Sequence, residues 1–195
     1  MSQVRVQGNA SGTGILTVTS PNTNSNYTLT LPAQTGTILT NASPGTVLQV
    51  VQTIPTPAQV AVTNSGANYF VTFTTSNTAL AFSGSITLSS ASSKVLVQLK
   101  TNIDADTNTY AEYVLLFRSS TLLASDIVYR RVNGTEPIIH AINYLDSPAT
   151  AGTVQYDIRF GAVNASPTLS FNRSNSATGG AWALDTTLIL TEIAG

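Results

Sequence analysis

The sequence predicts an all-β protein with a short N-terminal β-strand anchor and a C-terminal antiparallel jelly-roll-like sandwich. Three observations support this fold class. Apolar residues alternate with Thr, Ser and Asn along many short segments, turn pairs such as Asn133-Gly134 separate these segments, and no segment shows the 3.6-residue period of a helix. Thr is β-branched, and Ser and Asn compete with the helix backbone for hydrogen bonds, so this composition favours strands and turns.

The first 45 residues contain short predicted strands with turns between them. Residues 4–6, 15–19, 27–31 and 37–40 have strand-like character, and Pro32 ends the third strand because it lacks a backbone donor. A few short strands with one thin apolar face are at the margin of independent stability. We therefore expect copies of the chain or another protein to complete this segment.

The distribution of charge supports the same expectation. Arg5 and Lys94 bracket residues 6–93, which contain no Asp, Glu, Lys or Arg, whereas a soluble surface carries charges at roughly a quarter of its positions. We predict that residues 1–45 anchor the chain to another virion protein of the capsid or tail. The predicted interface residues are Ile15, Leu16, Val18, Tyr27, Leu29, Leu31, Ile38 and Leu39.

Residues 46–64 are expected to form an extended connector. Asn41 to Gly45 is rich in turn residues, and Pro55 and Pro57 fix φ and block a helix. Residues 47–51 alone could begin a strand.

The folded body is predicted at residues 65–195, because only one of the thirteen Tyr and Phe residues precedes position 69 and aromatic side chains supply much of a compact core. The predicted strands are 69–74, 79–88, 94–103, 110–118, 121–129, 137–145, 153–163, 168–171 and 181–193. Residues 113–117 are nearly all apolar, so we expect this strand to be buried on both faces. A neighbouring subunit in a trimer would cover the second face.

Composition excludes several classes of function. The net charge of −1 and the lack of a basic cluster argue against nucleic-acid binding. There is no cysteine, hence no disulfide framework or thiolate chemistry. No apolar run approaches the ~18–20 residues needed to insert into a membrane, and the first residues lack a secretory signal, so we expect synthesis in the cytoplasm.

Several segments resemble tailed-bacteriophage virion appendage proteins, both tail-fibre-like and head-decoration-like. Residues 12–18, 27–32 and 36–40 resemble the N-terminal strand repeat of that group, and residues 89–97 and 116–122 resemble hairpins of its C-terminal domain. The resemblance implies a structural protein of the bacteriophage particle, a homotrimer on the virion surface that is assembled in the host cytoplasm. It would act as a short fibre or as a head-decoration (cement) protein with an exposed knob.

One weak candidate for a cation site is the run Asp104, Asp106 and Asn108, whose side-chain oxygens alternate as in calcium loops. Thr109 replaces the EF-hand glycine and Leu115 stands in place of the bidentate glutamate. The alternative is a polar loop whose side chains cap turns. We therefore predict neither a metal nor another cofactor.

The sequence does not indicate an enzyme. His140 is the single histidine, it lies among apolar residues, and no Gly-x-Ser-x-Gly nucleophile elbow is present. The carboxylates are scattered singly along the chain, unlike the paired carboxylates of glycosidases.

The alternative function is a carbohydrate- or receptor-binding adhesin module of a tail fibre. Trp182 and Tyr144 are the candidate contacts for a host-surface glycan, because exposed aromatic rings stack on sugars. For a lone Trp at the head of a strand, packing in a core or subunit interface is the competing interpretation.

Overall fold

The computed structural model describes residues 11–15, 17, 19, 22–26, 28, 43–63, 72–105, 111–128, 138–163, 166–172 and 185–195. The chain divides into two compact units, residues 1–37 and residues 38–195. The described residues of the first unit are exposed and none lies in a strand, including those within the predicted strands 15–19 and 27–31. The predicted strands 4–6 and 37–40 lie outside the described residues.

The second unit is built from antiparallel strands, and its described residues form ten of them. They are β1 (Val47–Thr53), β2 (Ala58–Ala61), β3 (Ala79–Leu88), β4 (Lys94–Ala105), β5 (Ala111–Arg118), β6 (Thr121–Val128), β7 (Ile138–Asp146), β8 (Gly152–Val163), β9 (Thr168–Phe171) and β10 (Thr187–Ile193). Within the described segments, no helix has the length and hydropathy required to cross a bilayer.

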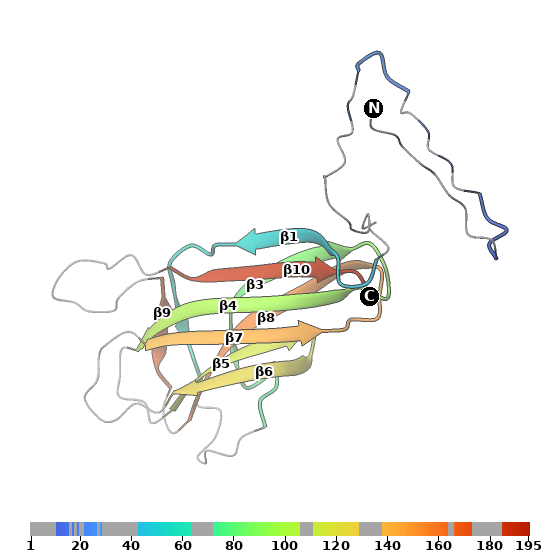
Figure 1. The fold of residues 1–195 in the computed structure, drawn as a ribbon. Coiled ribbons are helices and arrows are strands. Elements are labelled where there is room, and N and C mark those ends of the chain that lie inside the picture. Colours follow the sequence, from blue (N-terminus) through green and yellow to red (C-terminus); the bar gives the residue numbers. More distant parts are fainter. Residues whose placement is uncertain are drawn as a thin grey trace. The chain divides into compact units, whose positions relative to one another are not determined.

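The strands form two sheets that lie face to face (Figure 1). One sheet has the order β1-β10-β4-β7. β9 pairs with the end of β4, at Ile103–Ala105, beyond the residues of β4 that pair with β10, and β2 pairs with β9. The other has the order β3-β8-β5-β6. The antiparallel pairs β1/β10, β3/β8, β4/β7 and β5/β6 are nested in the sequence. Such nesting wraps a chain into a jelly roll, so the predicted all-β antiparallel sandwich is confirmed.

Most strands of the predicted body agree with the structure within one or two residues, from β3 to β9. Two segments differ. Phe73 and Thr74, in the predicted strand 69–74, are not in a strand, and β10 begins at Thr187, whereas the prediction began at residue 181. Residues 181–184 lie outside the described residues.

The expected connector at residues 46–64 contributes two strands to the sandwich instead. β1 pairs with β10 and β2 pairs with β9, so the folded body begins at Val47 and not near residue 65. Pro55 and Pro57 separate the two strands. Both strands lie at the edge of the sheet, where a missing backbone donor costs no ladder hydrogen bond.

The main core lies between the two sheets and is made by the inward side chains of both. Its largest fully buried members include Tyr156, Phe160, Phe171, Ile103, Leu116, Ile158, Leu169, Leu188 and Leu190. Gly84 lets β3 approach β10 closely, because a Cβ atom there would lie 2.7 Å from Leu188 Cδ2. Close packing of this kind makes the core sensitive to the loss or gain of single methyl groups.

The second face of β5 is covered by the same chain, which corrects the expectation that a neighbouring subunit covers it. Tyr113, Leu115 and Phe117 form a second buried cluster with Phe73. The rings of Phe73 and Tyr113 have centroids 4.4 Å apart. Burial on both faces of β5 therefore gives no argument for a trimer.

Hydrogen bonds hold the segment that carries Phe73 in place. Arg159 Nε donates to Thr78 Oγ1, and Arg159 Nη2 donates to the carbonyl oxygens of Thr75 and Thr78, each at 2.8 Å. Asn77 Oδ1 accepts from the Thr74 backbone N–H at 2.7 Å. The Arg159 side chain thus ties β8 to this turn.

Candidate assembly surface

The outer face of one sheet carries apolar side chains across four strands. Val50 pairs with Thr191, Thr191 with Leu96, and Leu96 with Leu145, so these four side chains share one face. Exposed apolar side chains on or beside this face are Val47 (56%), Val50 (60%), Ile54 (67%), Ile139 (65%) and Leu145 (51%). We call the outward side of β1, β10, β7 and residues 94–100 of β4 the apolar face. Gln52, Gln98 and Asn143 are exposed on the same face, so the surface is mixed, and the several large apolar side chains that it exposes make it a candidate surface for binding.

The apolar face carries charge of one sign. Lys94 and Lys100 lie on the outward side of β4 and are exposed. The carboxylates of these strands, Glu192 and Asp146, point the other way and are buried. A partner surface with an exposed carboxylate would therefore be complementary to this face.

A second apolar surface lies where β6 and β7 meet at the side of the sandwich. β6 is the terminal strand of its sheet, and it exposes Leu122 and Ile127. Asp126 lies between them in sequence and its side chain is 34% exposed. Leu122 and Ile127 lie on the same face of the sheet as Phe117 and Tyr113, whereas Asp126 points to the other face, toward His140.

The buried carboxylate of Glu192 joins the first strand, the last strand and the turn between β3 and β4. Glu192 Oε2 accepts from Gln49 Nε2 at 2.6 Å, and Glu192 Oε1 accepts from the Ser89 N–H, the Ser89 hydroxyl and the Ser93 hydroxyl at 2.7–2.8 Å. Burial disfavours the charged form, but these hydrogen bonds outweigh it and lower the pKa of Glu192 from 4.5 to about 2. This carboxylate therefore has a structural role.

A second buried network joins the two sheets at the ends of β5 and β7. Asp146 Oδ2 accepts from the Tyr156 hydroxyl at 2.8 Å, and Arg118 Nη1 lies 2.7 Å from both Asp146 oxygens. Burial, followed by the hydrogen bond to Asp146, raises the pKa of Tyr156. These three residues hold one another in place inside the protein.

His140 is completely buried on β7. Its Nδ1 lies 3.1 Å from Asp126 Oδ2, which also accepts from the Ala141 N–H at 3.3 Å. A His–Asp pair is part of a hydrolytic triad, but the triad needs an imidazole that a substrate can reach. This pair instead links β6 to β7 across the side of the sandwich.

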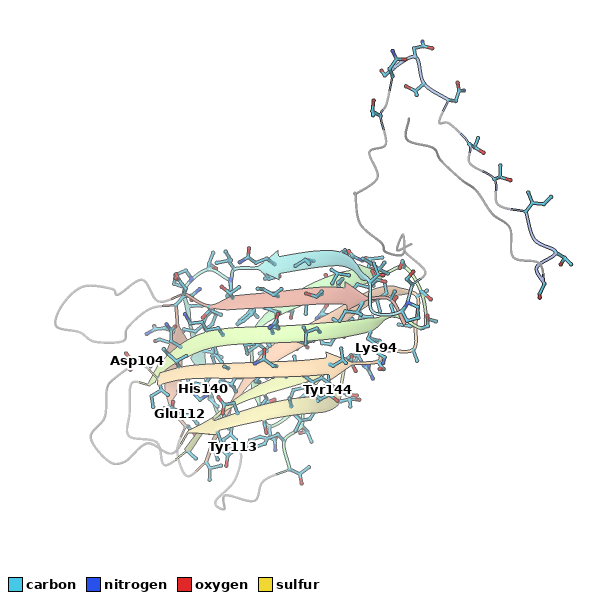
Figure 2. All side chains as sticks on the ribbon, in the orientation of Figure 1. Lys94, Asp104, Glu112, Tyr113, His140 and Tyr144 are labelled. Atoms are coloured by element: carbon cyan, nitrogen blue, oxygen red, sulfur yellow. The ribbon has the colours of Figure 1, made fainter. Side chains whose placement is uncertain are left out.

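The candidate cation run begins in a strand rather than in a loop. β4 continues to Ala105, and Asp104 is buried and paired in register with Ser170 (Figure 2). Asp106 and Asn108 lie outside the described residues. Within the part of the chain that the structure describes, no three His, Cys, Asp or Glu side chains form a metal-binding group.

The remaining predicted site residues are only partly described. Ile15 is 91% exposed, and its role in an anchor stays a prediction. Tyr144 is half-buried and packs against the main core, so its ring is not presented freely to a sugar. Leu16, Val18, Tyr27, Leu29, Leu31, Ile38, Leu39 and Trp182 lie outside the described residues.

Sequence reasoning missed the buried carboxylates. Glu192 shares the inward face of β10 with Leu188 and Leu190, and Asp146 shares that of β7 with Ile142. The alternation of inward and outward residues along each strand places both carboxylates on the core side, so this alternation could have predicted their burial. Sequence alone did not show which side chains would donate hydrogen bonds to them.

The topology defines the class of protein as an antiparallel jelly roll, a fold found in viral capsid, lectin and cupin domains. No protein-family model matches the sequence, and no curated protein matches it. Similar solved structures are one of the infectious bursal disease virus Gx strain (8% identity, 77% of this chain and 38% of that chain, TM-score 0.39) and the VP2 subviral particle of infectious bursal disease virus (8%, 74% and 40%, 0.36). The chain thus spans about two fifths of those viral proteins, and similarities this weak carry no functional conclusion.

Proposed function

We propose that the protein is a structural component of a bacteriophage particle, a homotrimeric virion-surface appendage with an N-terminal anchor and an exposed jelly-roll knob. The observation that carries this proposal is the apolar face, four of whose apolar side chains (Val47, Val50, Ile139 and Leu145) are more than half exposed in the single chain. A protein that works alone in solution seldom leaves such a face uncovered. The resemblance of residues 12–40 to phage appendage proteins supports the same proposal.

The interior of the jelly roll supports a building role over a catalytic one. The carboxylates of Glu192 and Asp146 and the imidazole of His140 are buried, and each is held by hydrogen bonds that join strands of the fold. Groups fixed in this way stabilise a rigid body. In this proposal the rigid body is displayed on the particle, and residues 1–45 attach it to a capsid or tail protein.

The described contacts indicate where an anchor deletion should end. The Gly45 N–H donates to the Ala194 carbonyl at 2.7 Å, and the Ala194 N–H donates to the Thr46 carbonyl at 2.8 Å. Residues from Ser43 onward therefore belong with the sandwich, slightly before the predicted boundary at residue 45. A shortened chain that lacks residues 1–40 keeps these contacts.

The test uses particles of the phage that encodes this chain. Purified particles should contain the full chain, whereas the chain lacking residues 1–40 should be folded in the lysate and missing from the particles. Electron microscopy with a label on Gly195 would then distinguish head from tail attachment. Incorporation of the shortened chain at full occupancy would show that residues 1–40 are not the anchor.

A further inference from the structure

We infer that Ile38 and Leu39, the last large apolar residues before the sandwich, are seated in a cavity at the end of the same jelly roll. The anchor is then joined to the body at a fixed point. This inference goes beyond the proposed function, because it concerns how the chain holds its own leading segment and not what that segment binds. The occupant is residues 38–40, which lie outside the described residues.

The cavity has a volume of about 330 Å³ and lies between the start of β1, the turn after β3 and the residues that follow β10. Its lining includes Leu48, Ser89, Ser90, Ser92, Ser93 and Ala194. β1 has a bulge between Val47 and Gln49, so Leu48 has no partner in the register with β10. A bulge changes the direction of a side chain, and the side of β1 that lines the cavity is this residue.

The chemistry of the cavity favours an uncharged, largely apolar occupant. The hydroxyls of Ser89 and Ser93 donate to the buried carboxylate of Glu192, and those of Ser90 and Ser92 bond to each other at 3.0 Å. Most of these donors are therefore already engaged inside the protein. A polar ligand would find few hydrogen bonds here, whereas apolar side chains would gain from burial against the aliphatic part of the wall.

The described contacts bring the chain to this cavity just after the inferred occupant. The Gly45 N–H donates to the carbonyl of Ala194, a residue of the cavity wall, at 2.7 Å. The Thr46 N–H donates to the Ser43 carbonyl at 3.1 Å, and the φ of Gly45 is +83°. These are features of a tight turn, which folds the chain back on itself.

The length of the tether selects the same chain as the source of the occupant. Leu39 is four residues from Ser43, and four residues span at most about 14 Å. A short tether gives the attached segment a high effective concentration, so it outcompetes the same segment of a second copy. The compact unit that contains the sandwich also begins at Ile38 and not at Ser43.

Disulfide trapping in the full chain tests the inference, and the absence of cysteine from the sequence removes any background. Ile38→Cys or Leu39→Cys is combined with Ser90→Cys or Ser92→Cys, which gives four pairs. A disulfide needs Cα atoms within about 7 Å of each other, and neighbouring side chains of an extended segment point to opposite sides. At least one pair should therefore close within a single chain under mild oxidation, as measured by mass spectrometry. The control combines Leu39→Cys with Ser85→Cys, on the exposed side of β3, and should stay reduced.

A second measurement is thermal unfolding of full-chain variants. Leu39→Asp or Ile38→Asp places a charge in the cavity and should lower the Tm by roughly 3–6 °C. Ile15→Asp is the matched control, because Ile15 is 91% exposed and its replacement should leave the Tm unchanged.

Three results would overturn the inference. The first is a disulfide that joins two chains, which would show that a second copy supplies the occupant. The second is no disulfide in any of the four pairs, or one that forms equally fast in the Ser85→Cys control. The third is an unchanged Tm in both aspartate variants. Circular dichroism of the reduced variants checks folding, and the pairs with Ser92→Cys replace those with Ser90→Cys if the latter are unfolded. All measurements use the isolated chain, so failure here is distinct from failure of the anchor on particles.

Discussion

The side-chain amide of Gln49 donates a 2.6 Å hydrogen bond to the buried carboxylate of Glu192. Gln49 belongs to β1 and Glu192 to β10, which are the first and last strands of the jelly roll. This bond therefore joins the two ends of the folded body. Because the serine donors to Glu192 come from the turn after β3, the same carboxylate also joins the two sheets.

Glu192→Gln should destabilise the protein by about 2–3 kcal/mol. The substitution replaces one carboxylate oxygen, which accepts hydrogen bonds in the wild type, by an NH₂ group that cannot accept them. Denaturant titration at pH 7 measures the change. Asp185→Asn is the matched control, since Asp185 is exposed and its neutralisation should change stability by less than about 0.5 kcal/mol. Equal stabilities for Glu192→Gln and wild type would contradict the structural role of Glu192.

Stability should fall in acid because of the same carboxylate. The pKa of Glu192 is lowered in the folded state, from 4.5 to about 2, so its contribution is present above pH ~4.5 and is lost as the pH falls toward 2. The shift corresponds to at most about 3 kcal/mol. Unfolding free energies measured from pH 6 to pH 2 should show this loss in the wild type and a shallower dependence in Glu192→Gln.

Gly161→Ala should be costly only while Phe73 is present. A Cβ atom at position 161 would lie 2.7 Å from Cε1 of the Phe73 ring, and overpacking of this kind costs roughly 1–3 kcal/mol. Phe73→Ala should itself cost about 3 kcal/mol, because it uncovers the outer face of β5. In a double-mutant cycle measured by thermal unfolding, Gly161→Ala should cost much less in the Phe73→Ala background. Additive effects would argue against this contact.

Asn172 should tolerate Gly better than Ala. Its φ of +56° is in the left-handed region, its Nδ2 donates to the Pro55 carbonyl at 2.7 Å, and its Oδ1 accepts from the Thr186 N–H. Both substitutions lose the two hydrogen bonds, but Ala adds the backbone cost of about 1 kcal/mol that Gly avoids. Chemical unfolding of both variants checks the order, and an Ala variant as stable as the Gly variant would contradict it.

The sequence predicted the bounds of a strand well where the pattern of apolar residues within that strand was sufficient. β3, β5 and β8 were predicted within one residue at each end, because each alternates or runs apolar between clear turns. The prolines at positions 55 and 57 misled the interpretation of residues 46–64. They were read as a connector, whereas an edge strand tolerates the interruption.

The candidate site was less predictable because it consists of relationships between distant residues. The alternation in β7 places Leu145 and Ile139 on one face, but only the strand pairing places Leu145 beside Leu96 and Val50 on the same face of the sheet. The anchoring role of the residues outside the described ranges remains a prediction; these residues are Leu16, Val18, Tyr27, Leu29, Leu31, Ile38 and Leu39. The sequence suggested Asp104 as a cation ligand in a loop. In the structure β4 continues to Ala105, so Asp104 is a buried strand residue.

By itself, the sequence determined that the protein is all-β, where most strands of its body lie, and that a long leading stretch carries no charge. These properties depend on local spacing and composition. Only the tertiary structure decided that Phe73 covers the second face of β5, that Glu192 is held by Gln49 and two serines, and that one sheet keeps an apolar outer face. The physical reason is that burial and hydrogen bonding depend on which strands become neighbours, and strand pairing is set by contacts across the whole chain.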